Sequence, residues 1–205
     1  MKRNIIRSAI FATTALAGLA LPTGLLAQNE NATTVSRVDL RPLNGSGAQG
    51  QATLRLSSDR RTLAIAIKAS GLEPGGPHIS HVHGRSEGGT PVDSTCPANS
   101  EDSDGDGFVE LEEGGLKYGP ILVDFMDVDP DRDGKVSFER TVRLTGAEQA
   151  LPLELRHIVV HGMTVPPGPG AGTPGEVDGK NGYLVVLPVL CGEIEQAGKG
   201  RPATR

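Results

Sequence analysis

Five histidines, gathered in two short segments, are the residues of this chain best suited to metal chemistry: His78, His81, His83, His157 and His161. Alternate residues of a β-strand point to the same face, so one strand would project His81 and His83 together and another His157 and His161. If these strands are neighbours, three or four imidazoles converge, and imidazole is a common ligand of copper and zinc. Three residues before His81, His78 falls on the opposite face. The alternative is that all five are ordinary polar residues on strands.

An acidic segment between the two histidine groups matches a calcium-binding loop. Residues 102–113, DSDGDGFVELEE, fit the pattern D-x-D-x-D-G-x5-E, with Gly107 at the sharp turn. The expected ligands are four carboxylates and one backbone carbonyl, from Asp102, Asp104, Asp106, Glu113 and Phe108 respectively. A solvated acidic loop is the alternative, and it leaves the complete pattern to chance.

A second acidic segment, residues 129–140, repeats only the start of this pattern. Asp129, Asp131 and Asp133 occupy the first three ligand positions, but Arg140 stands where the last carboxylate belongs. This is therefore the weaker calcium candidate. Neither segment is flanked by two long helical patterns, so we expect calcium loops inserted into a β domain rather than a complete helical EF-hand pair.

Strand patterns surround these segments. Apolar residues alternate with polar ones over residues 52–56 and 63–68, with a turn between them, which predicts a β-hairpin. Residues 84–119 carry no strand periodicity and are expected to form an inserted loop region. Short strands and abundant glycine and proline predict an all-β sandwich or barrel. Further strands are expected at 78–84, 119–128, 135–144, 155–163 and 183–194.

The N-terminus has the layout of a secretory signal peptide over residues 1–27. A basic head precedes an apolar run from Ala9 to Leu21, which is 13 residues long, and Ala27 offers a small residue for cleavage. An uncleaved anchor is the alternative, but a membrane span needs roughly 20 residues. We therefore expect a periplasmic or secreted protein with no membrane span after cleavage.

The charge balance argues against nucleic acid as a partner. Cleavage would remove three positive charges and no acid, which takes the formal net charge from −5 to −8. Cys96 and Cys191 are the only cysteines, and in an exported protein one disulfide is the default, with two free thiols as the alternative. The bond would close a loop of about 95 residues and stabilise the fold by roughly 4–5 kcal/mol.

Three motifs, in their order, resemble the copper/zinc superoxide dismutase superfamily. SGLEPGGPHISHVHG at 70–84 resembles its copper-ligand strand, RHIVVHG at 156–162 resembles the strand with a further copper ligand, and LCGEI at 190–194 resembles the closing segment with its disulfide cysteine. The resemblance implies a Greek-key β-sandwich or barrel over 37–195. Residues 98–135 would be an acidic calcium-loop insertion, between flexible ends at 28–36 and 196–205.

Carried over residue by residue, the resemblance implies that copper is held by His81, His83 and His161, which would then be the catalytic residues. His157 is a candidate fourth ligand. The resemblance also pairs Cys96 with Cys191 and makes superoxide, or another small oxidant, the substrate.

The departures from the family are equally informative. Its bridging histidine and zinc ligands follow the first cysteine, but this chain has no histidine between Cys96 and Thr141, so no zinc site of the family type is expected. The family's guiding arginine before the last cysteine is also missing, and Arg85 and Arg156 remain as candidates to replace it. Some relatives, like the similar CHRD domains, lack the catalytic ligands altogether.

The first interpretation is thus an exported, copper-binding, superoxide-dismutase-like domain with calcium-stabilised loops. An alternative of another class is a non-catalytic metal-binding or extracellular structural or interaction domain on the same fold. A third is a calcium-dependent structural protein whose histidines bind no redox metal.

Overall fold

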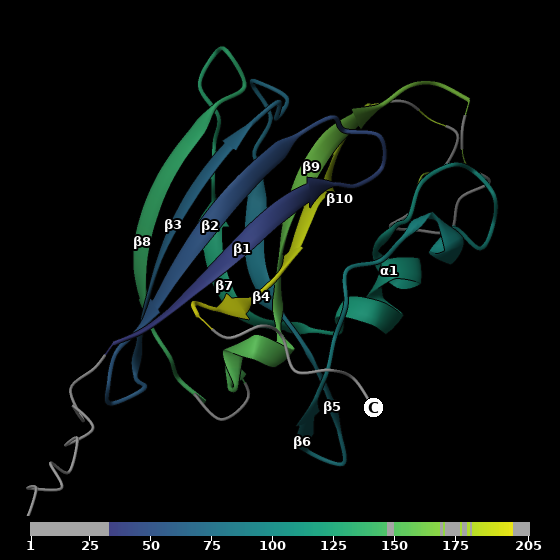
Figure 1. Cartoon of the computed structure of the whole chain (residues 1–205). Coiled ribbons are helices and arrows are strands. Elements are labelled where there is room, and N and C mark those ends of the chain that lie inside the picture. The colour runs from purple at the N-terminus through teal and green to yellow at the C-terminus, as the bar shows by residue number, and fades with distance from the viewer. Residues whose placement is uncertain are drawn as a thin grey trace, which may run out of the picture.

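A computed structural model describes residues 33–146, 150–168, 170, 177, 180 and 182–198. Its main feature is one antiparallel sheet that curls into a nearly closed barrel (Figure 1). The strands of this sheet are β1 (Thr34–Pro42), β2 (Gln49–Leu56), β3 (Thr62–Ser70), β4 (Ile79–His83), β7 (Ile121–Asp127), β8 (Val136–Arg143), β9 (His157–Val165), β10 (Gly182–Glu193) and β11 (Glu195–Gln196). The all-β sandwich or barrel predicted from the sequence is confirmed.

The strand order places distant segments side by side. It runs β7-β4-β9-β10-β1-β2-β3-β8, with β11 beside β1. The connection from β3 to β4 therefore crosses from one layer, β1-β2-β3-β8, to the other, β4-β7-β9-β10 (Figure 1). The edge strands β7 and β8 are linked by a side chain, because the Arg140 guanidinium donates to the Phe125 carbonyl at 2.6 Å.

The core follows from the period-two patterns. The predicted hairpin is confirmed as β2 and β3, which pair Leu54 with Ile65. Both side chains are almost fully buried, because alternate residues of each strand point into the barrel. With no tryptophan in the chain, the interior is filled mainly by aliphatic residues, and Phe125 is the aromatic at its centre.

The segment 84–119 was expected to be an inserted loop, and this was only partly right. It contains a small hairpin, β5 (Arg85–Glu87) with β6 (Thr90–Val92), then a 3-10 turn, η1 (Asn99–Glu101), and the helix α1 (Leu111–Tyr118). The strands are too short to show an alternation. The helix holds only eight residues, two of them glycine, and it starts at a capping box in which the side chains of Glu110 and Glu113 each accept a backbone N–H.

The expected flexible ends also differ from the structure. Residues 34–36 of the segment 28–36 lie in β1 and pair with β2, and Gln196 of the tail lies in β11. These residues gain ladder hydrogen bonds that their polar composition did not indicate. A second 3-10 turn, η2 (Leu153–Leu155), precedes β9. The predicted signal peptide lies outside the described residues, and no helix in the described part is long and apolar enough to cross a membrane.

Candidate metal centre

The two histidine-bearing strands are neighbours. In the β4–β9 ladder, His83 lies opposite His157, and His81 lies opposite Val159. The intervening residues Val82 and Ile158 belong to the barrel core. Because side chains alternate along a strand, the histidines point to the outer face of the barrel. There, Val159 packs with Tyr118 and Cys191 in a separate cluster, beneath α1 and its flanking loops.

Three imidazoles converge on this outer face: His81, His83 and His161. Their ring centroids are 5.5–5.9 Å apart. One ring nitrogen from each lies within 4.8 Å of those of the other two. Each residue is at most 6% exposed. This is a spacing at which three imidazoles can hold one metal ion.

Each ring has its second nitrogen committed to an oxygen. His83 Nδ1 donates to the Gly119 carbonyl at 2.8 Å, and His161 Nδ1 donates to that of Val186 at 2.6 Å. His81 Nε2 lies 3.5 Å from a carboxylate oxygen of Asp124. Such partners hold the tautomer and orientation of a metal-binding histidine.

The remaining nitrogens fit a metal ion. His81 Nδ1, His83 Nε2 and His161 Nε2 are buried and have no hydrogen-bond partner among the described residues. A buried polar atom without a partner is costly. Because the opposite nitrogens of His83 and His161 donate to carbonyls, these two rings present lone pairs, which a metal ion accepts.

The rings are neutral when the site holds no metal. Burial lowers the pKa of His161 to about 3 and that of His83 to about 4, and it also lowers the pKa of His81. The Asp124 carboxylate opposes this shift at His81. Metal binding requires the neutral imidazole, so the site is ready for a metal at neutral pH without losing protons.

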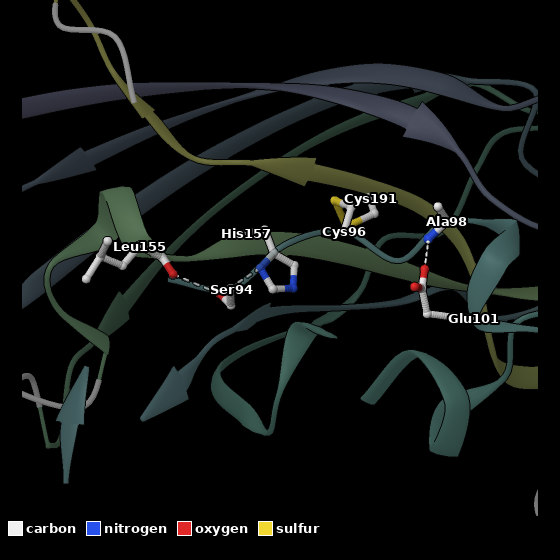
Figure 2. Close-up of a disulfide and its surroundings, with 7 residues drawn as sticks. All are labelled: Ser94, Cys96, Ala98, Glu101, Leu155, His157 and Cys191. Carbon is white, nitrogen blue, oxygen red and sulfur yellow. Dashed lines mark hydrogen bonds between the residues drawn. A yellow bond between two sulfur atoms is a disulfide. The ribbon is translucent and has the colours of Figure 1, made fainter. Parts of the chain in front are cut away.

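The other two histidines do not join this group. The ring of His157 stacks on His83 with centroids 6.1 Å apart, while its Nδ1 lies 3.1 Å from Ser94 Oγ. That hydroxyl donates to the Leu155 carbonyl at 2.8 Å (Figure 2), so it accepts the Nδ1–H of His157. The structure thus places His157 beside the three-histidine group and outside it.

His78 precedes β4 and supports the site from the backbone side. Its Nδ1 lies 3.0 Å from the His161 carbonyl, and its Nε2 lies 2.9 Å from that of Glu73. Tyr183 meets the ring edge-on. The contact with the His161 carbonyl ties the backbone of a group member to the turn before β4.

The two arginines considered as replacements for a guiding cation are engaged elsewhere. The guanidinium of Arg156, which is 1% exposed, donates to the carbonyls of Arg85 and Val92 on the β5–β6 hairpin. Arg85 forms an ion pair with Glu87. Arg156 therefore braces the hairpin.

Sequence reasoning missed two residues that contact the group. Asp124 lies opposite His81 in the β4–β7 register, and Tyr118 packs its ring 4.8 Å from that of His83. The segment 119–128 was expected to be a strand, but its partner and register were unknown. Tyr118 lies on the unpredicted helix α1, and a lone tyrosine carries no metal signal.

The predicted disulfide is confirmed. Cys96 and Cys191 are bonded, with Cα atoms 5.8 Å apart, and no free cysteine remains. Figure 2 shows the bond beside His157. The bond fastens the segment that follows β6 to β10. This segment therefore covers the outer face of the barrel next to the histidines.

The first acidic loop brings three of its predicted ligands together. Carboxylate oxygens of Asp102, Asp104 and Asp106 lie within 4.8 Å of one another. The Glu113 carboxylate accepts the N–H and hydroxyl of Ser103. The side chain of Phe108 packs against the buried cluster of Val165, Val177 and Leu187. The loop is followed by α1 but preceded only by the 3-10 turn η1.

The second acidic loop is arranged differently. Asp129, Asp131 and Asp133 are not among the groups that the described structure brings within ligand distance. The carboxylate of Asp131 instead accepts the backbone N–H groups of Asp133 and Lys135, both at 2.9 Å. It stabilises the turn into β8.

Neither family models nor curated protein sequences match this chain.

Proposed function

We propose that this chain is an exported copper-binding protein of the superoxide-dismutase-like kind, which converts superoxide at a single copper ion held by His81, His83 and His161. The observation that carries the proposal is the group of three buried imidazoles. One ring nitrogen of each lies within 4.8 Å of those of the other two, and each ring has a buried nitrogen without a hydrogen-bond partner among the described residues. Three neutral imidazoles suit copper and zinc better than hard cations.

A copper ion bound there would supply one-electron redox chemistry, by which two superoxide ions and two protons become one dioxygen and one hydrogen peroxide. The residues of the chain would orient and insulate that ion. Gly119 and Val186 hold the rings of His83 and His161 through their carbonyls, and the Asp124 carboxylate lies 3.5 Å from Nε2 of His81. Tyr118 covers His83 from the solvent side of the sheet.

Export is part of the proposal and rests on two features. The N-terminal sequence has the layout of a signal peptide. The disulfide between Cys96 and Cys191 is of a kind that persists mainly in oxidising compartments.

A second candidate function is metal binding without turnover. It is favoured by the commitment of Arg156 to backbone carbonyls and by the low exposure of the three rings. A cation near a site draws superoxide toward it, and an acidic protein without one repels this anion.

The experiment that tests the proposal uses the mature protein loaded with Cu²⁺ and freed of excess metal. Copper stoichiometry, the electron paramagnetic resonance spectrum and superoxide dismutation are measured on one sample. The double variant His81→Ala/His161→Ala removes two expected ligands. His157→Gln is the matched control, because it alters a neighbouring ring outside the group.

We expect one copper ion per chain, nitrogen hyperfine structure and dismutation, all lost in the double variant and kept in His157→Gln. Bound copper with no dismutation would establish the second candidate. Failure to bind copper, with circular dichroism showing a folded protein, would overturn both.

A further inference from the structure

Glu110 is a buried carboxylate that was not among the expected calcium ligands and takes no part in the histidine site. It is 2% exposed and lies at the start of α1, within the acidic loop 102–113. Its Oε1 accepts the backbone N–H of Val177 at 3.0 Å. Its Oε2 is buried and accepts no hydrogen bond from the described residues, and the same is true of Asp106 Oδ2.

The loop that contains Glu110 is rich in negative charge. Residues 102–113 include six acidic residues and no lysine, arginine or histidine. A buried carboxylate among five other acidic residues needs a counter-charge to remain ionised.

We propose that the loop binds one Ca²⁺ ion and that Glu110 is a ligand, together with Asp102, Asp104 and Asp106. Calcium takes six to eight oxygen ligands and tolerates irregular geometry, which suits a loop of closely spaced carboxylates. Glu110 fills the ninth position of the loop pattern, where a ligand acts directly or through water. Its oxygen without a partner adds a second buried donor beside Asp106 Oδ2.

Glu113 has a different part in this site. Its carboxylate accepts the N–H and hydroxyl of Ser103 and the N–H of Glu110, which closes the loop and caps α1. Glu110 and Glu113, at the ninth and twelfth positions of the loop pattern, therefore have different roles. Glu110 completes the cation site, and Glu113 holds the loop around it.

The site also connects three parts of the chain. Glu110 is the N-cap of α1, its Oε1 binds the N–H of Val177, and Asp106 belongs to the loop itself. A cation that binds Glu110 and Asp106 would join the helix start, the segment before β10 and the inserted loop. We therefore expect calcium to stabilise the folded chain as well as to bind it.

The test is calorimetric titration of CaCl₂ into the chelator-treated mature protein, repeated in the His81→Ala/His161→Ala background. Because that background lacks the proposed copper site, calcium binding can succeed or fail independently of copper. Glu110→Gln removes the charge but keeps an oxygen for Val177. Glu112→Gln is the matched control, since Glu112 is exposed on the first turn of α1. Asp106→Asn is a second variant, and melting temperature with and without calcium is a second readout.

We expect one Ca²⁺ per chain in both backgrounds and a calcium-dependent rise in melting temperature. Affinity should fall about tenfold or more in Glu110→Gln and Asp106→Asn and stay within about twofold in Glu112→Gln, since ligand charge tunes calcium affinity. No calcium binding by the unaltered protein, or a preference for Mg²⁺, would overturn the calcium site. Unchanged affinity in Glu110→Gln would overturn the role of Glu110.

Discussion

Each of the three clustered histidines divides its two nitrogens between the centre and an oxygen acceptor. His83 and His161 use backbone carbonyls, whereas His81 faces the carboxylate of Asp124, a side chain that can be changed without moving the main chain. Asp124 is therefore the position at which the outer support of the site can be tested. Such outer partners typically alter metal affinity by about 10- to 100-fold.

Replacing Asp124 with asparagine should weaken copper binding by about tenfold, because the neutral amide supports the Nε2 proton of His81 less strongly. Competition with a chelator of known affinity measures the change. Asp127→Asn is the control, since Asp127 is an exposed acid on the same strand β7. Equal affinities in the two variants would show that Asp124 does not act on His81.

In the metal-free protein, the stability that comes from His83 and His161 should fall as the pH is lowered from about 7 to 5. Burial lowers the folded-state pKa values of these residues to about 4 and 3, below the ordinary histidine pKa of about 6.5. At these two positions the unfolded chain therefore binds more protons below pH 6.5, so their contribution is complete above that pH and is lost through this window. We expect this contribution to fall by about 2–4 kcal/mol, measured by urea denaturation as the difference from a variant without the two histidines.

The double variant His83→Gln/His161→Gln provides the comparison for this pH effect. Because it lacks both rings, its stability relative to the unaltered protein should rise by that amount as the pH falls from 7 to 5. An unchanged slope would assign the pH dependence to other groups.

At the scale of elements, α1 links the acidic loop to the histidine group. It begins next to Glu110 and ends at Tyr118, whose ring packs on His83, and the following Gly119 accepts the Nδ1–H of that ring. Gly119 has a φ of 72°, and a Cβ there would lie 2.5 Å from the Gly84 carbonyl oxygen. Only glycine therefore fits the close approach of α1 to the end of β4.

The acidic loop is itself fastened to the barrel by Asn44. The side-chain amide accepts the N–H of Val109 at 2.7 Å and donates to the carbonyls of Val109 and Pro188 at 3.0 Å. It pairs with Val109 much as a neighbouring strand would. Pro188 lies opposite His161 in the β9–β10 ladder, so this clamp joins the loop to the strands of the metal group.

Replacing Asn44 with alanine should lower the free energy of unfolding by about 2 kcal/mol or more, because Val109 loses both partners. Hydrogen exchange should increase over residues 105–113 more than elsewhere. Gln51→Ala is the control, since its amide makes an exposed hydrogen bond to Asp39. Equal exchange in both variants would contradict the role of Asn44 as a clamp.

At the scale of the whole molecule, the barrel is a frame that carries its site on the outside. The core residues face inward, whereas Tyr118 of α1 and the disulfide lie over the outer face, where the histidines are buried. The bond between Cys96 and Cys191 spans a sequence separation of 95 residues. Opening this bond would release the covering segment from β10 in the folded protein. It would also widen the range of conformations open to the unfolded chain.

The variant Cys96→Ser/Cys191→Ser should lose about 4 kcal/mol of stability, as expected for a closed loop of this length. Urea denaturation of the metal-free protein measures the loss, and the reduced unaltered protein should match the variant. If reduction leaves the stability unchanged, the disulfide has no part in holding the cover.

The sequence by itself determined most strands of the barrel, the histidine pairs and the acidic ligand pattern. These properties are local: a period-two alternation or a ligand spacing is visible within ten or so residues, as in residues 52–56 or 102–106. The disulfide was predicted as the default for an exported protein with two cysteines.

Only the tertiary structure decided which side chains meet. The register of β4 with β7 and β9 places Asp124 on His81 and leaves His157 beside the group. The folding of α1 against β4 adds Tyr118, and the packing of the acidic loop buries Glu110. Such contacts depend on strand register and on burial between segments distant in sequence, and neither is written in the spacing of residues along one segment.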